Sequence, residues 1–163
     1  MADATTGISL WQVLAPVIVG GLIGVGGSLV GPWLIQDRKE AAEKKQRRAE
    51  KFEELVTALF ELHHWMAKMG NVRVFGEERD LEMSPIAKVQ AISAVYFPEF
   101  EEEIRALDIA ADRYELWAMK ATGKRLKKES GFADGGSDEY EPYMEKFYPL
   151  MNTLRKYSRK EFQ

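Results

Sequence analysis

The sequence ISLWQVLAPVIVGGLIGVGGSLVGPWLI, residues 8–35, contains no charged side chain in 28 positions. A helix of about 20 apolar residues is long enough to cross the roughly 30 Å hydrocarbon core of a bilayer. Trp11 and Trp33 stand near the two ends, and aromatic side chains are enriched where a helix leaves the membrane. The two are 22 positions apart, about 33 Å along a helix. The stretch therefore predicts one membrane-spanning helix.

Two other structures could account for residues 8–35. A cleaved secretory signal has a positively charged start and an apolar core of roughly 7–15 residues. Residues 1–7 contain Asp3 and no Lys or Arg, and the apolar stretch is longer. A buried hairpin of a soluble protein would suit the glycine-rich segment GGLIGVGG, residues 20–27. The length of the stretch and its flanks favour the membrane helix over both.

The basic residues near this stretch lie on one side of it. Seven occur in residues 36–51 and none before the stretch: Arg38, Lys39, Lys44, Lys45, Arg47, Arg48 and Lys51. The positive-inside rule then predicts a single-pass protein of the inner (plasma) membrane, with residues 1–7 outside and the C-terminus cytoplasmic. We expect Trp11, Trp33 and the basic residues up to Arg48 to lie at the membrane interfaces, beside anionic lipid head groups. The absence of cysteine agrees with a reducing compartment.

The predicted span has a face lined by glycine. Gly20, Gly24, Gly27 and Gly31 follow at spacings of four, three and four, and Ser28 borders them. Small residues at such spacings let a second helix approach closely, and packing then holds the pair. Because the chain offers one span, we expect a homo-oligomer through this helix. A nucleotide-binding loop is excluded, because the G-x-G-x-x-G order and a P-loop lysine are missing.

The chain after the span begins with two helical segments. Residues 36–51 alternate Glu, Lys, Arg and Ala with little to bury, which predicts a charged helical stalk. An apolar stripe at spacings of three and four then predicts a packing helix that ends at Gly70-Asn71. The stripe consists of Phe52, Leu55, Leu59, Leu62, Met66 and Met69. We expect residues 70–83 to form a loop with a brief extended piece.

Proline marks the next two helices. Ser84-Pro85 offers a cap followed by proline at the first helical position. The short helix before Pro98 would bury Ile86, Val89, Ile92 and Val95. A longer helix is expected from Pro98 to about Glu129, with acidic residues in its first turns and basic residues in its last, as the helix dipole favours. Its apolar stripe is Phe100, Ile104, Leu107, Ala111, Tyr114, Ala118 and Ala121.

A linker at residues 131–136 precedes the last predicted helix, for which Ser137 is the expected cap. This helix repeats apolar side chains at helical spacing: Tyr140, Tyr143, Met144, Phe147, Leu150, Met151 and Leu154. Pro149 falls inside the run and predicts a kink or a break near residue 148. Since no segment alternates with period two, the predicted fold class is all-α. It comprises a span at 8–35, a stalk at 36–51 and a small antiparallel cytoplasmic helical bundle at 52–163.

Alternating helices would return the C-terminal basic residues to the end of the bundle that lies nearest the membrane. These residues are Arg155, Lys156, Arg159 and Lys160. We expect them beside the first basic cluster, where they either contact the bilayer or form an ordinary solvated helix end.

The sequence predicts no catalytic, cofactor or metal site. His63 and His64 point about 100° apart on a helix, and no cysteine or suitably spaced histidine completes a metal site. The acidic run at 101–103 is explained by a helix N-terminus, and the acids at 134–139 lack the EF-hand pattern. No nucleophile has a visible partner, so an enzyme is disfavoured. The net charge of −3 argues against a nucleic-acid partner.

The last helix carries more aromatic side chains than one face can bury. We expect some of them to form a protein-binding face, namely Tyr140, Tyr143, Tyr148 and Tyr157. The expected function is a membrane-anchored module that self-associates and recruits or senses a cytoplasmic protein partner. The alternative is an oligomeric pore-forming or membrane-perturbing protein, such as a holin-like protein, a channel subunit or a defence effector. Gln12 and Ser28 are the side chains that could hydrate such a pore.

Overall fold

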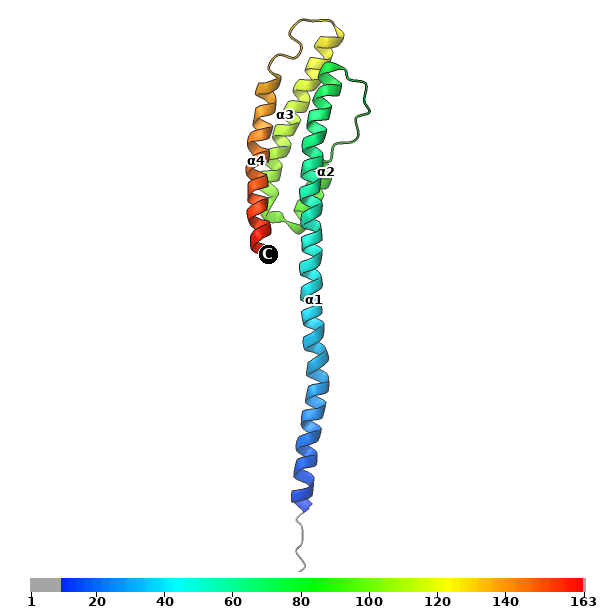
Figure 1. Ribbon diagram of the computed structural model, residues 1–163, viewed down its shortest axis with the longest axis vertical. Coiled ribbons are helices and arrows are strands. Elements are labelled where there is room, and N and C mark those ends of the chain that lie inside the picture. Colours follow the sequence, from blue (N-terminus) through cyan, green and yellow to red (C-terminus); the bar gives the residue numbers. More distant parts are fainter. Residues whose placement is uncertain (1–9, 163) are drawn as a thin grey trace, which may run out of the picture. The chain divides into compact units, whose positions relative to one another are not determined.

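The computed structural model describes the backbone of residues 10–162 and the side chains of residues 39–162 (Figure 1). The helices are α1 (Leu10–Gly70), α2 (Ile86–Tyr96), α3 (Glu101–Leu126) and α4 (Gly136–Glu161). A π-helical turn, Asn71–Phe75, follows α1, and a 3₁₀ turn, Pro98–Phe100, precedes α3. No strand occurs between residues 10 and 162, which confirms the all-α prediction.

The chain divides into two compact units, Met1–Gln46 and Arg47–Gln163. In the first unit, residues 10–46 are helical as part of α1. The predicted span, with its tryptophans and its glycine face, lies outside the residues whose side chains are described, and so does Arg38. Among the residues whose side chains are described, no helix combines the length and apolar character that a membrane crossing needs.

The second unit is an antiparallel helical bundle. The ring of Phe52 on α1 lies 5.5 Å from that of Tyr157 on α4, and the ring of Phe60 lies 6.2 Å from that of Phe147. Helices α1 and α4 therefore run antiparallel. Helices α3 and α4 also run in opposite directions, and α4 ends beside the start of α1 in this unit (Figure 1). The predicted antiparallel bundle is present within residues 47–162.

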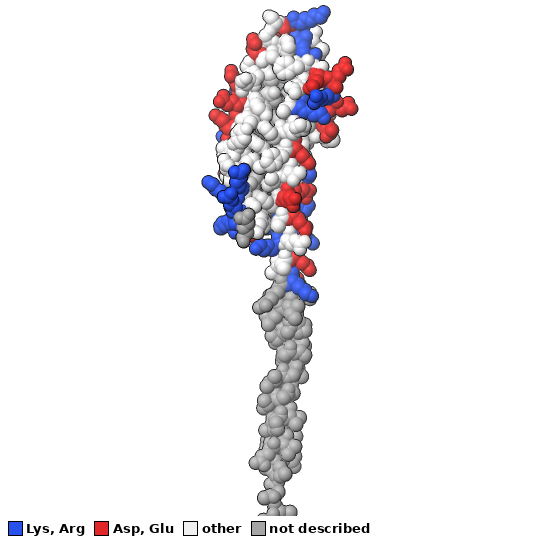
Figure 2. All heavy atoms as spheres, in the orientation of Figure 1, with Lys and Arg blue, Asp and Glu red and all other residues white. Residues whose placement is uncertain are grey.

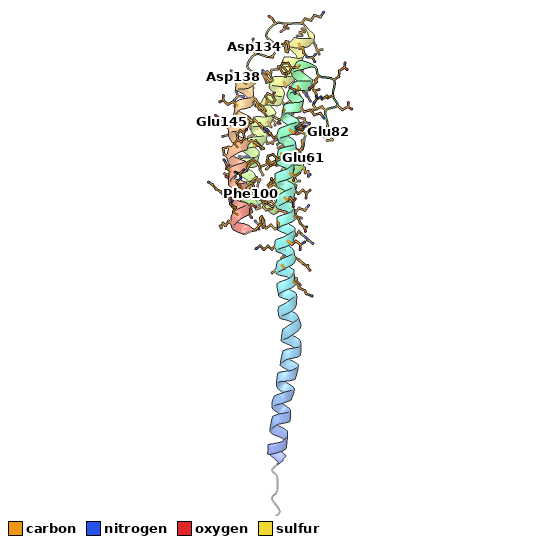
Figure 3. The ribbon with its side chains drawn as sticks, viewed as in Figure 1. Glu61, Glu82, Phe100, Asp134, Asp138 and Glu145 are labelled. Atoms are coloured by element: carbon orange, nitrogen blue, oxygen red, sulfur yellow. The ribbon has the colours of Figure 1, made fainter. Side chains whose placement is uncertain are left out.

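The core of the bundle follows the three predicted stripes. Every member of the α1 stripe from Phe52 to Met69 is buried, and so is every member of the α3 stripe from Phe100 to Ala121. Helix α4 contributes Tyr143, Phe147, Leu150 and Leu154. Phe100 lies inside the bundle (Figure 3), at the end where α1, the 3₁₀ turn and α4 meet. Helical periodicity therefore predicted most of the buried positions of these three helices, although Trp65 is buried outside its stripe and Tyr140 is only half-buried.

Three predicted details in the middle of the chain are wrong. Residues 71–75 form a π-helical turn and not an extended piece, because Val74 is fully buried and the left-handed Gly76 (φ 76°) closes the turn. Val95 is 70% exposed, whereas Phe97 is fully buried. The buried side of α2 follows Val89 and Ser93 at an interval of four residues. The same interval continues to Phe97, directly after the helix ends at Tyr96, whereas Val95 lies off this line. Ser84 is not the cap of α2, because Pro85 occupies the N-cap position and the helix begins at Ile86; the Ser84 Oγ accepts the amide of Ile86 at 3.4 Å from one residue further back.

Two predicted details of α4 are also wrong. Ser137 is not the cap, because Gly135 occupies the N-cap position in a left-handed conformation (φ 78°) that favours glycine. Pro149 does not break the helix, since α4 continues from Gly136 to Glu161. Phe147 and Leu150 are buried on both sides of the proline, so α4 packs on the core before and after it.

Candidate functional site

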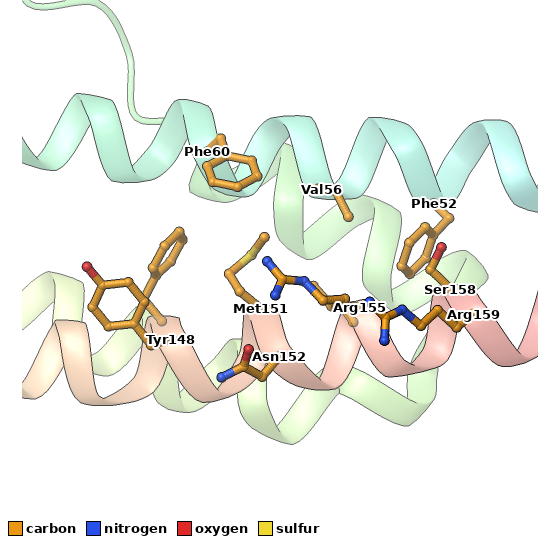
Figure 4. A pocket seen from close by; sticks show the side chains of 11 residues that line it. Phe52, Val56, Phe60, Tyr148, Met151, Asn152, Arg155, Ser158 and Arg159 are labelled. Carbon is orange, nitrogen blue, oxygen red and sulfur yellow. The ribbon is translucent and has the colours of Figure 1, made fainter.

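A concave surface with a mainly apolar lining lies between α1 and α4 (Figure 4). It is an open groove of about 440 Å³. Its floor consists of Phe52, Val56 and Phe60 from α1 and of Phe147, Met151 and Leu154 from α4; Tyr148, Asn152, Arg155, Ser158 and Arg159 complete the lining. An apolar surface with a few polar groups is the usual composition of a binding site.

The groove exists because α1 carries two adjoining apolar lines. The first, through Leu55, Leu59 and Leu62, is buried in the core. The second, Phe52, Val56 and Phe60, repeats every four residues on the neighbouring face and points toward α4. Aromatic side chains bridge the two helices at the ends of this line and leave Phe60 more than half exposed. The single stripe that we predicted for α1 omitted Val56 and Phe60, and their spacing was the signal for a second face.

The end of the groove nearest the C-terminus of α4 is basic. Arg155 and Arg159 are exposed one turn apart on α4, and Figure 2 shows basic side chains gathered over this end of the helix. Within residues 39–162, neither guanidinium group forms a hydrogen bond or an ion pair. Two like charges at positions i and i+4 destabilise a helix by about 0.2–0.5 kcal/mol. An anionic group bound between Arg155 and Arg159 would therefore relieve the repulsion between them.

The neighbouring basic residues of α1 already have partners. Arg48 donates to Glu99 Oε1 and to the Tyr157 hydroxyl, each at 2.8 Å, and its guanidinium lies 5.4 Å from the centre of the Phe97 ring. Lys51 forms an ion pair with Glu54 at 2.6 Å. The contacts of Arg48 join the start of the bundle to the 3₁₀ turn and to the end of α4. Within the second unit, the C-terminal basic segment of α4 therefore lies beside Arg48, the part of the predicted juxtaposition that falls in this unit; Lys39, Lys44, Lys45 and Arg47 are exposed.

The four tyrosines predicted as a partner face do not form one exposed surface. Tyr143 is fully buried between His63, Tyr140 and Phe147. Tyr140 and Tyr157 are half-buried, and Tyr157 packs on Phe52 and Phe100. Only Tyr148, at 58%, remains exposed among the four, and it lies on the rim of the groove. Tyr140, Tyr143 and Tyr157 are covered because they lie on the side of α4 that faces the core.

His63 is half-buried between α1 and α4. Its ring stacks on Phe147 at 4.6 Å, and its Nδ1 is shielded from solvent without a hydrogen-bond partner among the described residues, like the hydroxyl of Tyr143. Burial, and then the charge of His64, lowers the pKa of His63. Burial raises the pKa of Tyr143. Within residues 39–162, no three His, Asp or Glu side chains converge to hold a metal ion.

We expect His63 to make the bundle less stable in mild acid. Above the ordinary histidine pKa of 6.5, His63 is neutral in the folded and unfolded chain, and the imidazole adds no pH dependence. Below it, the unfolded chain takes up a proton that the folded chain resists, so the free energy of unfolding falls. Urea unfolding of the full chain between about pH 8 and about pH 5 measures this slope. His63→Phe should reduce the slope more than His64→Gln, because His64 is exposed; equal slopes in all three proteins would contradict the assignment.

No protein-family model, no curated protein and no solved structure matches this chain.

Proposed function

We propose that the protein is a single-pass membrane-anchored interaction module whose cytoplasmic bundle binds an acidic, amphipathic helix of a partner protein. The observation that carries the binding function is the open apolar groove between α1 and α4 with the arginine pair Arg155 and Arg159 at its end. The anchor is supported by the sequence, through the uncharged stretch at 8–35 and the basic residues that follow it.

In this proposal, the first unit holds the protein at the inner membrane. The glycine face from Gly20 to Gly31 supports self-association of the span, and the basic residues from Arg38 to Arg48 suit contact with anionic lipids. Residues 36–51 act as a stalk, and residues 52–163 form the cytoplasmic part. Oligomerisation would then increase the number of bundles available to a multivalent partner.

The shape and chemistry of the groove favour a helix as its occupant. The lining runs lengthwise between two antiparallel helices, and Phe52 to Phe60 covers about 12 Å of α1, roughly two turns. A partner helix with apolar residues at i, i+3, i+4 and i+7 would fill such a groove. Arg155 and Arg159 would then bind Asp or Glu at one end of that helix, because guanidinium groups bind carboxylates in a bidentate manner.

Site-specific photo-crosslinking in cells tests this proposal. A photoreactive amino acid replaces Met151, which lines the groove, and a control chain carries it at Met144, which is similarly half-buried on α4 but outside the groove. We expect the Met151 position to capture a protein segment that is amphipathic and carries Asp or Glu beside its apolar face. Arg155→Glu with Arg159→Glu should lower this capture at least tenfold, about 1.4 kcal/mol of binding free energy.

The matched control reverses two charges at the other end of the bundle. Lys124 and Lys127 are exposed on or beside the last turn of α3, and neither lines the groove. Lys124→Glu with Lys127→Glu should therefore leave capture unchanged. Capture of phospholipid, capture of a second copy of this chain, or capture that survives the reversal at Arg155 and Arg159 would contradict the proposal. An absent product at Met151 would contradict it as well.

A further inference from the structure

Helix α3 has a second apolar face that points away from the bundle. Four large apolar side chains on it are exposed to solvent: Ile109 (62%), Leu116 (57%), Met119 (45%) and Leu126 (71%). The opposite face of the same helix holds the buried stripe from Ile104 to Ala121. Single exposed apolar residues are common on protein surfaces, whereas several on one face mark an interaction site.

The spacing of these four residues is that of a coiled coil. They follow one another at intervals of seven, three and seven, so Ile109 and Leu116 take a positions of a heptad and Met119 and Leu126 take d positions. Asp112 and Gly123 occupy the remaining two positions of this seam. A strict seven-residue repeat moves about 20° per heptad around a straight helix, which suits left-handed pairing with another helix. Helix α3 is already held in helical form by the bundle, so a seam of this length needs no further ordering of its backbone.

The charges beside the seam select both the partner and its direction. Asp108 and Glu115 occupy the g positions, and Arg113 and Lys120 occupy the e positions five residues after each of them. Two parallel, in-register copies would therefore place Asp108 opposite Arg113 and Glu115 opposite Lys120 of the second chain. In an antiparallel pair, acidic residues would face acidic residues and basic residues would face basic ones.

We propose that α3 forms a parallel, in-register contact with α3 of a second copy of this chain. Asp108, Arg113 and Glu115 also have partners within their own chain, namely Gln90, Glu139 and Arg73. Exposed ion pairs are weak, so the charges determine the direction of pairing while the apolar seam holds the helices together. Asp112 opposes the contact, because the parallel arrangement brings two copies of this carboxylate together.

This inference goes beyond the proposed recruitment of a partner, since it concerns a different face of the bundle. It does not depend on the groove or on the membrane anchor. Two copies in one membrane would nevertheless present α3 in the same direction, which agrees with a parallel pair.

Disulfide formation between single-cysteine variants of the full chain tests the contact. The natural sequence has no cysteine, so Ile109→Cys, Leu126→Cys and the control Val95→Cys each carry one thiol. Val95 is as exposed as the seam residues but lies on α2. A disulfide requires Cα atoms about 4.4–6.8 Å apart. We expect Ile109→Cys and Leu126→Cys each to form a dimer with itself on mild oxidation, and Val95→Cys to form much less.

Mixing the two seam variants determines the direction of the pair. Positions 109 and 126 are about 26 Å apart along α3, so a parallel pair cannot join Ile109→Cys to Leu126→Cys. An antiparallel pair centred on the seam would join them, and that mixed product would overturn the proposal. Equal oxidation of Val95→Cys would also overturn it, because it would reflect random collision or association through another segment.

Two further variants separate the seam from the membrane anchor. Leu116→Glu in the Ile109→Cys chain should abolish the disulfide, whereas Asp112→Leu should increase its yield. Leu116 is exposed and outside the core, so its replacement leaves the bundle folded, as the circular dichroism spectrum would verify. A disulfide that persists in the Leu116→Glu chain would show that another contact, such as the predicted span, brings the two copies together, and would overturn the inference.

Discussion

Phe97→Ala should lower the free energy of unfolding of the bundle by about 3–5 kcal/mol, the range for a large aromatic side chain removed from a core. Phe97 is fully buried and connects α2 to the 3₁₀ turn that precedes α3. Its ring lies 5.6 Å from that of Phe52 on α1 and 6.2 Å from that of Tyr157 on α4. The substitution therefore leaves a cavity at the point where α1, α2 and α4 meet.

The loss should exceed that of an ordinary core residue, because Arg48 also loses a partner. Its guanidinium lies over the Phe97 ring at 5.4 Å, a contact worth about 0.5–1 kcal/mol at exposed sites. Urea unfolding of the full chain in detergent, followed by circular dichroism, measures the change. Phe75→Ala is the control, because Phe75 is exposed and should change the stability by less than about 0.5 kcal/mol. Equal losses in the two variants would show that Phe97 does not connect the helices as described.

The core could be predicted from the sequence because burial in a helix repeats with the helical period. Leu59 and Tyr114 belong to uninterrupted stripes, and both are buried in the bundle. The prediction failed where the helix ended or where backbone geometry decided the outcome. Val95 follows the buried Ile92 by three positions, but it lies off the line of Val89 and Ser93 that faces the core. Gly135 displaced Ser137 as the cap through its left-handed backbone.

The candidate groove could not be predicted in the same way. A stripe shows which residues of one helix share a face, but not which second helix lies opposite or how closely it approaches. Tyr143 and Tyr148 are both aromatic and five positions apart, yet one is fully buried and the other lies on the groove rim. The sequence alone also could not show which arginines have partners within the chain. The guanidinium of Arg48 binds Glu99 and Tyr157, whereas that of Arg155 is exposed in the groove.

Val19→Arg together with Ile23→Arg should remove the protein from the membrane. The stretch 8–35 contains 14 Leu, Ile and Val residues, which favour insertion by about 0.3–0.6 kcal/mol each, or roughly 4–8 kcal/mol in all. An arginine near the middle of a span costs about 2.5–3.5 kcal/mol, so two of them cost roughly 5–7 kcal/mol and cancel most of that gain. Both positions lie near the centre of the stretch, where neither side chain reaches the interface easily.

Carbonate extraction and centrifugation of cell membranes measure this change. We expect the natural chain to remain entirely in the pellet and the double-arginine chain to move to the supernatant or to be degraded. Val19→Leu with Ile23→Leu keeps the apolar character and should behave like the natural chain. The decisive comparison is the natural chain itself, because a spanning helix is anchored almost irreversibly, whereas a segment bound to the surface by Lys and Arg is released at high pH. Release of the natural chain would therefore show that the basic residues hold the protein at the surface, and that residues 8–35 do not cross the bilayer.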